Sequence, residues 1–227
     1  MGKIIAVEGI DGSGKGTQSN LLCERLINNG LTCELISFPQ YEKNFFGQEV
    51  GKYLNGEFGD IDTVDPHFAS ILYAGDRFES LERIGELISK SDFVICDRYT
   101  PSNIAHQSAK VSKSKRPQFQ KWISKLEYGV FGLPEPDAVI LLDMDPIFSM
   151  RLVKKKQKRN YTNKSHDIHE ENFEYLTRVR NTYLQLSEQT NWVTVSCLNG
   201  KSLRNIEDIQ GEIWHEILSK FPSGFLN

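Results

Sequence analysis

Hydrophobic positions along this chain fall into two alternating patterns. Short continuous apolar runs, typical of buried strands, predict strands at Lys3–Glu8, 32–38, Phe93–Asp97, Ala138–Asp143 and 192–197. Between them, apolar residues spaced three and four apart predict helices at Lys15–Asn28, 48–54, 66–90, 168–189 and 203–221. Strands separated by helices need crossover connections, which favour a parallel sheet. We therefore expect one α/β domain over 1–227, doubly wound, with a mostly parallel five-stranded sheet flanked by helices.

Composition narrows the class of protein. The chain has 227 residues, with 27 Lys and Arg against 30 Asp and Glu. A domain of this size buries about 70% of its unfolded surface, so it needs no disulfide scaffold. Its apolar runs are far shorter than the roughly 20 residues that span a bilayer, and no signal-peptide pattern opens it. The four cysteines form no C-x-x-C pair, and we expect reduced thiols in a cytoplasmic protein.

A glycine-rich segment follows the first predicted strand and opens the first predicted helix. Its residues are Gly9, Ile10, Asp11, Gly12, Ser13, Gly14, Lys15, Gly16 and Thr17. In such a loop the backbone N–H groups and the helix N-terminus face phosphate oxygens, and the lysine reaches the β and γ phosphates. The required order of strand, loop and helix is present. We expect this segment to bind ATP.

One position departs from the usual phosphate-loop pattern. The residue after Lys15 is commonly Ser or Thr, whose hydroxyl meets Mg²⁺, but here it is Gly16. The adenylate kinase loop also reads Gly-Lys-Gly-Thr, so the variant is compatible with nucleotide binding. We expect Mg²⁺ to keep more water here, with Asp11, Asp97 and Thr17 as candidate ligands.

Three further segments, taken together with the loop, resemble thymidylate kinases. They are Phe-Pro-Gln-Tyr at 38–41, Leu-Tyr-Ala-Gly-Asp-Arg at 72–77 and Asp-Arg-Tyr-Thr-Pro-Ser-Asn-Ile-Ala-His-Gln at 97–107. The stretch 167–186 also looks like the family's helix after the lid. The resemblance covers most of the chain. It implies a P-loop NTPase fold of the nucleoside monophosphate kinase kind, transfer of phosphate from ATP to dTMP with Mg²⁺, and a homodimer. From the composition and the short apolar runs we expect no nucleic-acid or membrane partner.

The resemblance also implies roles for residues around the acceptor. Arg98 would hold the monophosphate and Arg77 would also reach the base, since guanidinium groups make forked bonds to phosphate. An ion pair with Asp76 or Asp97 is the structural alternative for these arginines. The remaining acceptor contacts are expected from Phe38 and Tyr73 at the ring, Tyr41 near the phosphate end, and Ser102 and Asn103 at the base. The alternatives are ordinary core packing for Phe38 and Tyr73, a surface aromatic for Tyr41, and a turn residue for Asn103.

Two acidic residues and one histidine complete the expected site. By the resemblance, Asp11 lies near the acceptor sugar or the metal, and Asp97 orders metal-bound water or the arginines. Neither has to act as a general base, because the attacking phosphate is already ionised near neutral pH. His106 stands where the family commonly has Phe or Tyr beside the deoxyribose, which disfavours a 2′-hydroxyl. An imidazole also forms hydrogen bonds, so selection against ribose is expected to be weaker, and a core histidine is the alternative.

The segment 151–164 carries seven basic residues and no acidic one, namely Arg151, Lys154, Lys155, Lys156, Lys158, Arg159 and Lys164. Such a charge run is suited to a polyanion, although a solvated surface is its simplest interpretation. The phosphate loop contains no arginine, so charge stabilisation must come from elsewhere. We expect a basic lid near 151–167 that closes over the nucleotide, with Arg159 favoured over Arg151 and the lysines. The expected catalytic residues are therefore Lys15, Asp11, Arg98 and Arg159.

Other functions remain open at this stage. A kinase of another nucleoside monophosphate or of a deoxynucleoside would have the same fold, and a non-catalytic nucleotide-binding relative would keep the loop. A GTPase is disfavoured because Asn163-Lys164-Ser165-His166-Asp167 has one residue more than the guanine-reading motif. The chain is acidic overall and shows no nucleic-acid-binding module. His166, Asp167, His169 and Glu170 could suggest a metal, but acidic residues at a helix start are explained by the helix dipole.

Overall fold

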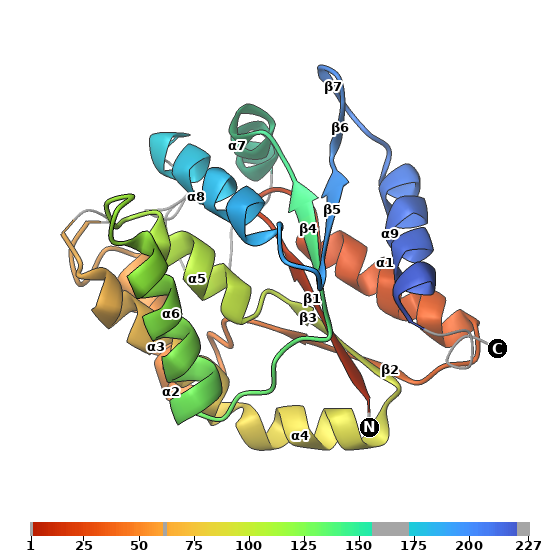
Figure 1. Cartoon of the computed structure of the whole chain (residues 1–227), viewed down its shortest axis with the longest axis horizontal. Coiled ribbons are helices and arrows are strands. Elements are labelled where there is room, and N and C mark those ends of the chain that lie inside the picture. Colours follow the sequence, from red (N-terminus) through yellow and green to blue (C-terminus); the bar gives the residue numbers. More distant parts are fainter. Residues whose placement is uncertain (1, 61–62, 156–172, 222–227) are drawn as a thin grey trace.

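A five-stranded parallel sheet forms the centre of the protein (Figure 1). The structure is a computed structural model that describes residues 2–60, 63–155 and 173–221. The strand order is β2-β3-β1-β4-β5, and every ladder between neighbours is parallel. The sheet predicted from the sequence is thus confirmed. The strands are β1 (Lys3–Glu8), β2 (Cys33–Ser37), β3 (Phe93–Asp97), β4 (Ala138–Asp143) and β5 (Trp192–Ser196).

Helices cover both faces of the sheet because successive strand side chains point to opposite sides. Ile5 of β1 shares a buried cluster with Leu22 and Leu26 of α1, whereas Ala6 shares another with Ile84 of α4. Helix α9 packs beside α1. The helices are α1 (Lys15–Asn28), α2 (Phe45–Leu54), α3 (Pro66–Glu79), α4 (Leu81–Lys90), α5 (Thr100–Ser108), α6 (Arg116–Ser124), α7 (Pro146–Lys155), α8 (Phe173–Leu186) and α9 (Ile206–Lys220).

The single long helix expected over 66–90 is wrong. The structure has two helices, α3 and α4, that meet at Ser80. The Ser80 hydroxyl donates to the Asp76 carbonyl and accepts from the Asn44 side chain, and serine bonds of this kind compete with continued helix. The break lets α4 lie along the sheet while α3 turns toward α2 and α5 (Figure 1).

Several elements have no counterpart in the sequence prediction. Helix α5 shows no apolar period because all nine of its residues, most of them polar, are buried, so it has no solvent-exposed face. Helix α2 begins at Phe45, ahead of the predicted start. Residue 203, expected in the last helix, lies instead in a small antiparallel hairpin before α9. The other unpredicted elements are α6, α7, a π-helix η1 (Lys125–Val130), and the hairpin strands β6 (Leu198–Asn199) and β7 (Ser202–Leu203).

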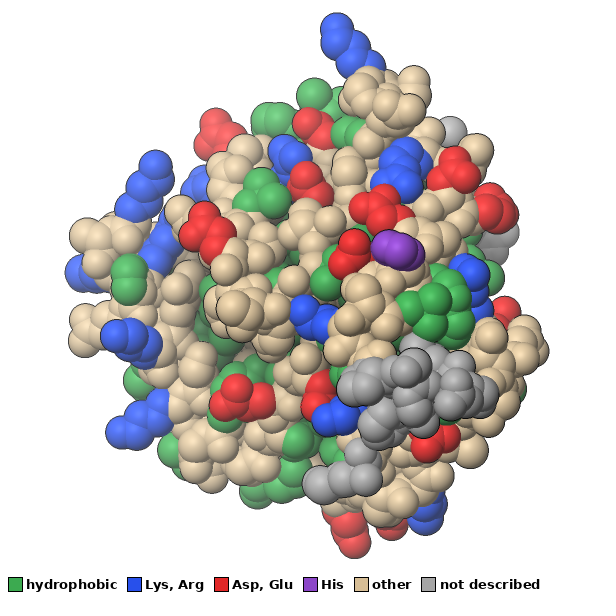
Figure 2. Space-filling model, turned by 45° about the vertical axis from the view of Figure 1, so that its right-hand side comes forward, with side chains coloured by type: hydrophobic (Ala, Val, Ile, Leu, Met, Phe, Trp, Pro, Cys, Tyr) green, Lys and Arg blue, Asp and Glu red, His purple; other side chains and the backbone are tan. Residues whose placement is uncertain are grey.

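The described residues include the start of the expected lid, up to residue 155. Residues 156–172, which include Arg159 and the sequence His166 to Glu170, lie outside the described residues. Within the described part of the chain, no helix has the length and apolar character needed to cross a membrane. On the face drawn in Figure 2, Lys and Arg side chains gather at the left-hand edge, and acidic and basic side chains are interspersed over the remainder.

Candidate active site

A cavity of about 360 Å³ opens at the carboxyl ends of the central strands. Ligands of open parallel sheets bind at this edge, where loops after the strands meet. Of the residues expected in the site, those lining the cavity are Asp11, Gly12, Gly14, Lys15, Gly16, Phe38, Tyr41, Tyr73, Arg77, Asp97, Arg98, Ser102, Asn103 and His106. The lining residues that sequence reasoning missed are Ser37, Pro39, Leu54 and Gln107. Gly9, Ile10, Ser13 and the exposed Thr17 belong to the same loop but do not line it.

The phosphate-binding loop has the backbone that its glycines predict. Gly12 and Gly14 have φ angles of 75° and 91°, in the region that favours glycine. A Cβ on Gly12 would lie 2.6 Å from the Ser149 carbonyl oxygen of α7, so the loop also needs the missing side chain there. Gly14 is the residue before α1, so the first free N–H groups of that helix face the loop. The loop can therefore accept phosphate oxygens.

Lys15 is buried in this loop. Its side chain is 7% exposed and its Nζ donates to the Ile10 carbonyl at 2.9 Å. Burial and, to a smaller extent, the nearby Arg98 charge lower the pKa of Lys15 to about 8, against the opposing effect of Asp11 and Asp97. Negative phosphate groups would restore the protonated form. The position is thus electrostatically prepared for an anion.

The presence of Gly16, where other phosphate loops commonly have Ser or Thr, has a steric reason. A Cβ at this position would lie 3.1 Å from Oδ2 of Asp97, so a serine or threonine would crowd that carboxylate. Asp97 lines the cavity, and among the described residues no hydrogen-bond donor to its carboxylate is found. Asp11, by contrast, is bonded to Arg98. An oxygen donor of this kind suits Mg²⁺, which keeps several waters and binds through one or two carboxylates plus phosphate oxygens. The described residues contain no cluster of three His, Cys, Asp or Glu side chains that could hold a metal by itself.

Arg98 has an unusual backbone conformation. It follows β3 directly, and its φ of 67° lies in the left-handed region, which is uncommon for residues with a side chain. Its NH2 donates to the Asp11 carboxylate, and its NH1 donates to the Ser102 hydroxyl at 3.1 Å. Burial opposes its charge, but Asp11 raises the pKa of Arg98 well above its ordinary value. The pairing with Asp97 considered above is not found. Backbone strain and fixed bonds together aim the guanidinium into the cavity.

Glu8 supports this arrangement from beneath. It is fully buried at the end of β1, and burial raises the pKa of its carboxyl above the usual range. Its oxygens accept from the Ser102 hydroxyl at 2.5 Å, the Tyr183 hydroxyl at 2.9 Å and the Tyr99 N–H at 2.8 Å. Sequence reasoning missed Glu8, although a charged residue inside an apolar strand next to the loop was the available signal.

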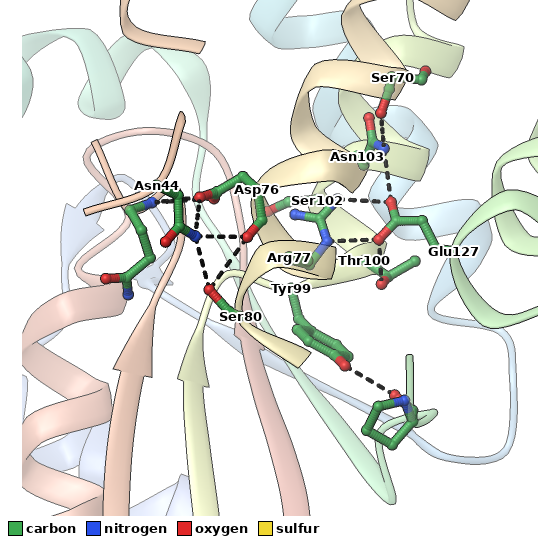
Figure 3. Close-up of polar contacts among 12 residues, drawn as sticks. Asn44, Ser70, Asp76, Arg77, Ser80, Tyr99, Thr100, Ser102, Asn103 and Glu127 are labelled. Atoms are coloured by element: carbon green, nitrogen blue, oxygen red, sulfur yellow. Dashed lines mark hydrogen bonds and ion pairs between the residues drawn. The ribbon is translucent and has the colours of Figure 1, made fainter. Parts of the chain in front are cut away.

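Arg77 is the second cavity arginine, and its partner is not Asp76. It is 1% exposed, and its Nε and NH2 donate to the two oxygens of Glu127, each at 2.6 Å. Asn103 also donates to Glu127, at 2.7 Å (Figure 3). The Asp76 carboxylate instead accepts from the Gln40 N–H and the Asn44 side chain. One forked edge of Arg77 is therefore occupied and cannot grip a phosphate.

Aromatic side chains line the same cavity as the two arginines. Phe38 is buried at the end of β2 and lies 6.0 Å from the Tyr99 ring, and the Phe38–Pro39 peptide bond is cis. Tyr73 of α3 contacts Tyr53 edge to face at 6.3 Å. With Tyr41 they give the cavity apolar faces next to charged groups. A flat ring with a charged tail fits such a space.

His106 lies on α5, one turn beyond Ser102. It is 6% exposed, its Nδ1 lies 3.2 Å from the Tyr175 hydroxyl, and its Nε2 lies 3.5 Å from NH1 of Arg98. Burial and, to a smaller extent, the Arg98 charge lower the pKa of His106 to about 3. The ring is therefore neutral near pH 7, and it lines the cavity beside Arg98.

Comparisons with known proteins agree with this geometry. Residues 7–213 match the thymidylate kinase family model. A thymidylate kinase from Plasmodium falciparum is 30% identical over 95% of this chain and 90% of its own, and a probable thymidylate kinase from Sulfolobus acidocaldarius is 31% identical over 95% and 96%. The solved thymidylate kinase from Candida albicans superposes with a TM-score of 0.72 at 22% identity, over 96% of this chain and 92% of that one.

The family match and the cavity support one another. The match spans both the phosphate loop and the wall formed by Asp97 to Gln107. The structural neighbour carries the same P-loop NTPase fold that the sheet order indicates. This chain belongs to the thymidylate kinase family and is accordingly a phosphotransferase, a dTMP kinase.

Proposed function

We propose that the protein transfers the γ-phosphoryl group of ATP to the monophosphate of dTMP, giving dTDP. The observation that carries this proposal is that Lys15 and Arg98 line one cavity, together with Asp11, which accepts a hydrogen bond from Arg98. Phosphoryl transfer is governed by positioning two anions in line and neutralising the charge that develops. Lys15 would hold the donor phosphates on the loop, and Arg98 would hold the acceptor phosphate.

The acceptor nucleoside would occupy the deeper part of the cavity. Phe38 and Tyr73 offer faces to the base, and Asn103 and Arg77 offer polar atoms to its edge. Tyr41 and Ser102 would flank the acceptor, and His106 would lie near the sugar. Asp11 would accept from the sugar hydroxyl or keep Arg98 in place.

Mg²⁺ would be bound mainly through donor phosphate oxygens and water, with Asp97 as the protein carboxylate that orders those waters. When bound, the ion would neutralise charge on the β and γ phosphates. Thr17 is the weakest of the candidate ligands, because it is exposed and does not line the cavity. We further propose that Arg159 supplies additional positive charge to the transferred group, with Arg151 as the alternate.

We also propose a homodimer that pairs through the outer face of α3. Phe68, Ile71 and Phe78 recur on one side of this helix and are 45%, 39% and 48% exposed. Phe45, at the start of α2, is 62% exposed. An apolar stripe of this kind is unfavourable in water and is typical of a surface covered by another chain. Light scattering should report a dimer, and Ile71→Arg should shift it to a monomer.

We place the enzyme in the cytoplasm. All four cysteines are free thiols, and Cys96 and Cys197 are buried in the sheet region. Burial raises the pKa of Cys197 to about 12, which keeps the thiol protonated and unreactive. A reducing compartment is the setting in which such thiols persist.

The activity is tested by following ADP release with ATP, Mg²⁺ and a panel of acceptors. dTMP, dUMP, ribo-TMP, dCMP, dGMP, AMP and thymidine should be compared at equal concentration. We expect dTMP to give the highest kcat/KM. A different leading acceptor would overturn the assignment of the base pocket, and ATP binding without turnover of any acceptor would overturn the enzymatic proposal.

A further inference from the structure

Arg77 and Asn103 mark the part of the cavity proposed to hold the base, which we call the base end. Glu127 is a buried carboxylate behind this base end, and it does not line the cavity itself. It is 0% exposed and lies on the π-helix η1, a rare geometry that frequently occurs at functional sites. Its oxygens accept two hydrogen bonds from Arg77, one from Asn103 and one from the Thr100 hydroxyl at 2.8 Å (Figure 3). Two of these three partners face the cavity. Glu127 therefore acts on the site through its neighbours.

The first neighbour is Asn103, whose amide is held in one orientation. Its Nδ2 donates to Oε1 of Glu127 at 2.7 Å and to the Ser70 carbonyl at 3.0 Å. Because the oxygen and nitrogen of an amide have similar shapes, the surrounding acceptors decide which one points where. Oδ1 is left on the other side, buried and without a hydrogen-bond partner among the described residues. A buried acceptor of this kind requires a donor, which a bound ligand can supply.

The second neighbour is Arg77. Glu127 engages its Nε and NH2, so the NH1 group points away from the carboxylate (Figure 3). Arg77 lines the cavity, as Asn103 does. Among the polar side-chain atoms of these two lining residues, Oδ1 of Asn103 and NH1 of Arg77 are the acceptor and the donor that Glu127 and Ser70 leave unengaged.

This pair distinguishes the two kinds of pyrimidine. Thymine carries an N3–H donor next to the O4 acceptor, whereas cytosine carries the N3 acceptor next to the N4 amino donor. We propose that Glu127 is a positioning residue that sets pyrimidine selectivity, by holding Asn103 and Arg77 in the arrangement that matches thymine and opposes cytosine. The proposal rests on the function proposed above, because it requires the acceptor base to occupy this cavity.

The direct test is Glu127→Gln, which keeps the size of the side chain and replaces one oxygen by an NH₂ group. The new NH₂ group would face a hydrogen-bond donor of Asn103, Arg77 or Thr100, which is unfavourable. If the Asn103 amide turns over, its oxygen can accept from the new NH₂ group, but its own NH₂ group then takes the place that Oδ1 holds in the wild type. We expect the ratio of kcat/KM for dTMP to that for dCMP to fall about tenfold or more, since hydrogen-bonded base contacts discriminate at this level. The KM for ATP should stay unchanged.

Glu8→Gln is the matched control. Glu8 is also 0% exposed and its partners are Ser102, Tyr99 and Tyr183, so the same chemical change is made without touching Asn103 or Arg77. This variant should keep the dTMP to dCMP ratio even if its turnover falls. If Glu127→Gln lowers kcat/KM equally for both acceptors and leaves the ratio unchanged, Glu127 is only structural and the inference is overturned.

A second variant covers the case in which Glu127→Gln does not fold. Removing one partner of a buried ion pair is strongly destabilising, whereas Glu127→Asp keeps the carboxylate charge opposite Arg77 and is therefore expected to fold. The shorter side chain cannot reach Arg77 and Asn103 together, so the ratio should fall, and a ratio like that of the wild type would refute the proposal. If the wild type itself shows no preference for dTMP over dCMP, the proposed function fails along with this inference. A preference that survives both variants overturns this inference alone.

Discussion

Arg98, at the end of β3, reaches back to the phosphate-binding loop, where its NH2 group donates to the Asp11 carboxylate. The two residues are far apart in sequence and follow two neighbouring strands of the sheet, β1 and β3. Asp11 keeps the guanidinium charged and fixed, while Ser102 holds its NH1. The glycine-rich loop after β1 and the residue after β3 are thus joined by a charge-assisted contact.

Replacing Arg98 by methionine should chiefly impair use of the acceptor. Loss of a fixed charged donor to a reacting phosphate typically costs about 10²- to 10³-fold in rate. We expect kcat/KM for dTMP to fall by this amount in steady-state kinetics, while the affinity for ATP changes little. Arg204→Met is the control, because Arg204 forms an ion pair with Glu212 and does not line the cavity. Kinetics like those of the wild type in Arg98→Met would contradict the assignment.

Lys15 should make ATP binding depend on pH above neutrality. Its pKa is lowered to about 8 by burial, so the free enzyme loses this positive charge as the pH rises past that value. If only the protonated form binds well, affinity for ATP should fall about tenfold between pH 7 and pH 9. Calorimetry at pH 8.5 in buffers of different ionisation enthalpy should detect proton uptake on binding. Lys15→Arg would remove the dependence, and a profile that stays the same in both proteins would rule out Lys15 as its source.

His106 should make the fold sensitive to acid. Its pKa is about 3 in the folded protein and about 6.5 in the unfolded chain, so the unfolded state binds more protons below pH 6.5. Stability is then complete above pH 6.5 and falls as the pH decreases toward 3. We expect this residue alone to lower the free energy of unfolding by about 2 kcal/mol between pH 7 and pH 5.

The measurement is urea denaturation of the wild type and His106→Phe at both pH values. Phenylalanine does not titrate, so the variant should lose about 2 kcal/mol less stability on acidification. An equal loss in the two proteins would show that His106 is not buried and neutral. The same variant tests the sugar contact, since the ratio of activity on dTMP to activity on ribo-TMP should rise.

Two helical glycines should respond in opposite ways to alanine. A Cβ on Gly75 would lie 2.5 Å from the Phe46 ring, at the place where α2 and α3 cross. Gly85, in the exposed part of α4, would meet nothing within 4 Å. Gly75→Ala should destabilise the protein by about 1–3 kcal/mol through overpacking. Gly85→Ala should stabilise it by about 0.5–1 kcal/mol, because alanine loses less backbone entropy in a helix. Thermal denaturation of both variants checks this, and shifts of the same sign would contradict the packing argument.

Much of the site could be predicted from the sequence because its determinants are local. The order of β1, loop and α1 follows from an apolar run, three glycines and an amphipathic stretch, and the structure places Lys15 and Gly16 in the cavity wall accordingly. The stretch from Asp97 to His106 carries its own motif, and five of its members line the same cavity. Sequence separation does not matter for such residues, since the ends of parallel strands meet at one edge.

The tertiary structure decided what depends on burial and on distant partners. Helix α5 has no readable period because other elements enclose it on all sides, and α3 separates from α4 because Ser80 bonds to Asn44 of another segment. Glu127 carries no local signal. Its role arises only where η1 brings a carboxylate behind Arg77 and Asn103. A sequence determines which side chains are present and the period in which they recur. The burial that strengthens the Arg77–Glu127 ion pair and keeps His106 neutral exists only after the chain has folded around these residues. The same is true of the acceptors that orient the Asn103 amide.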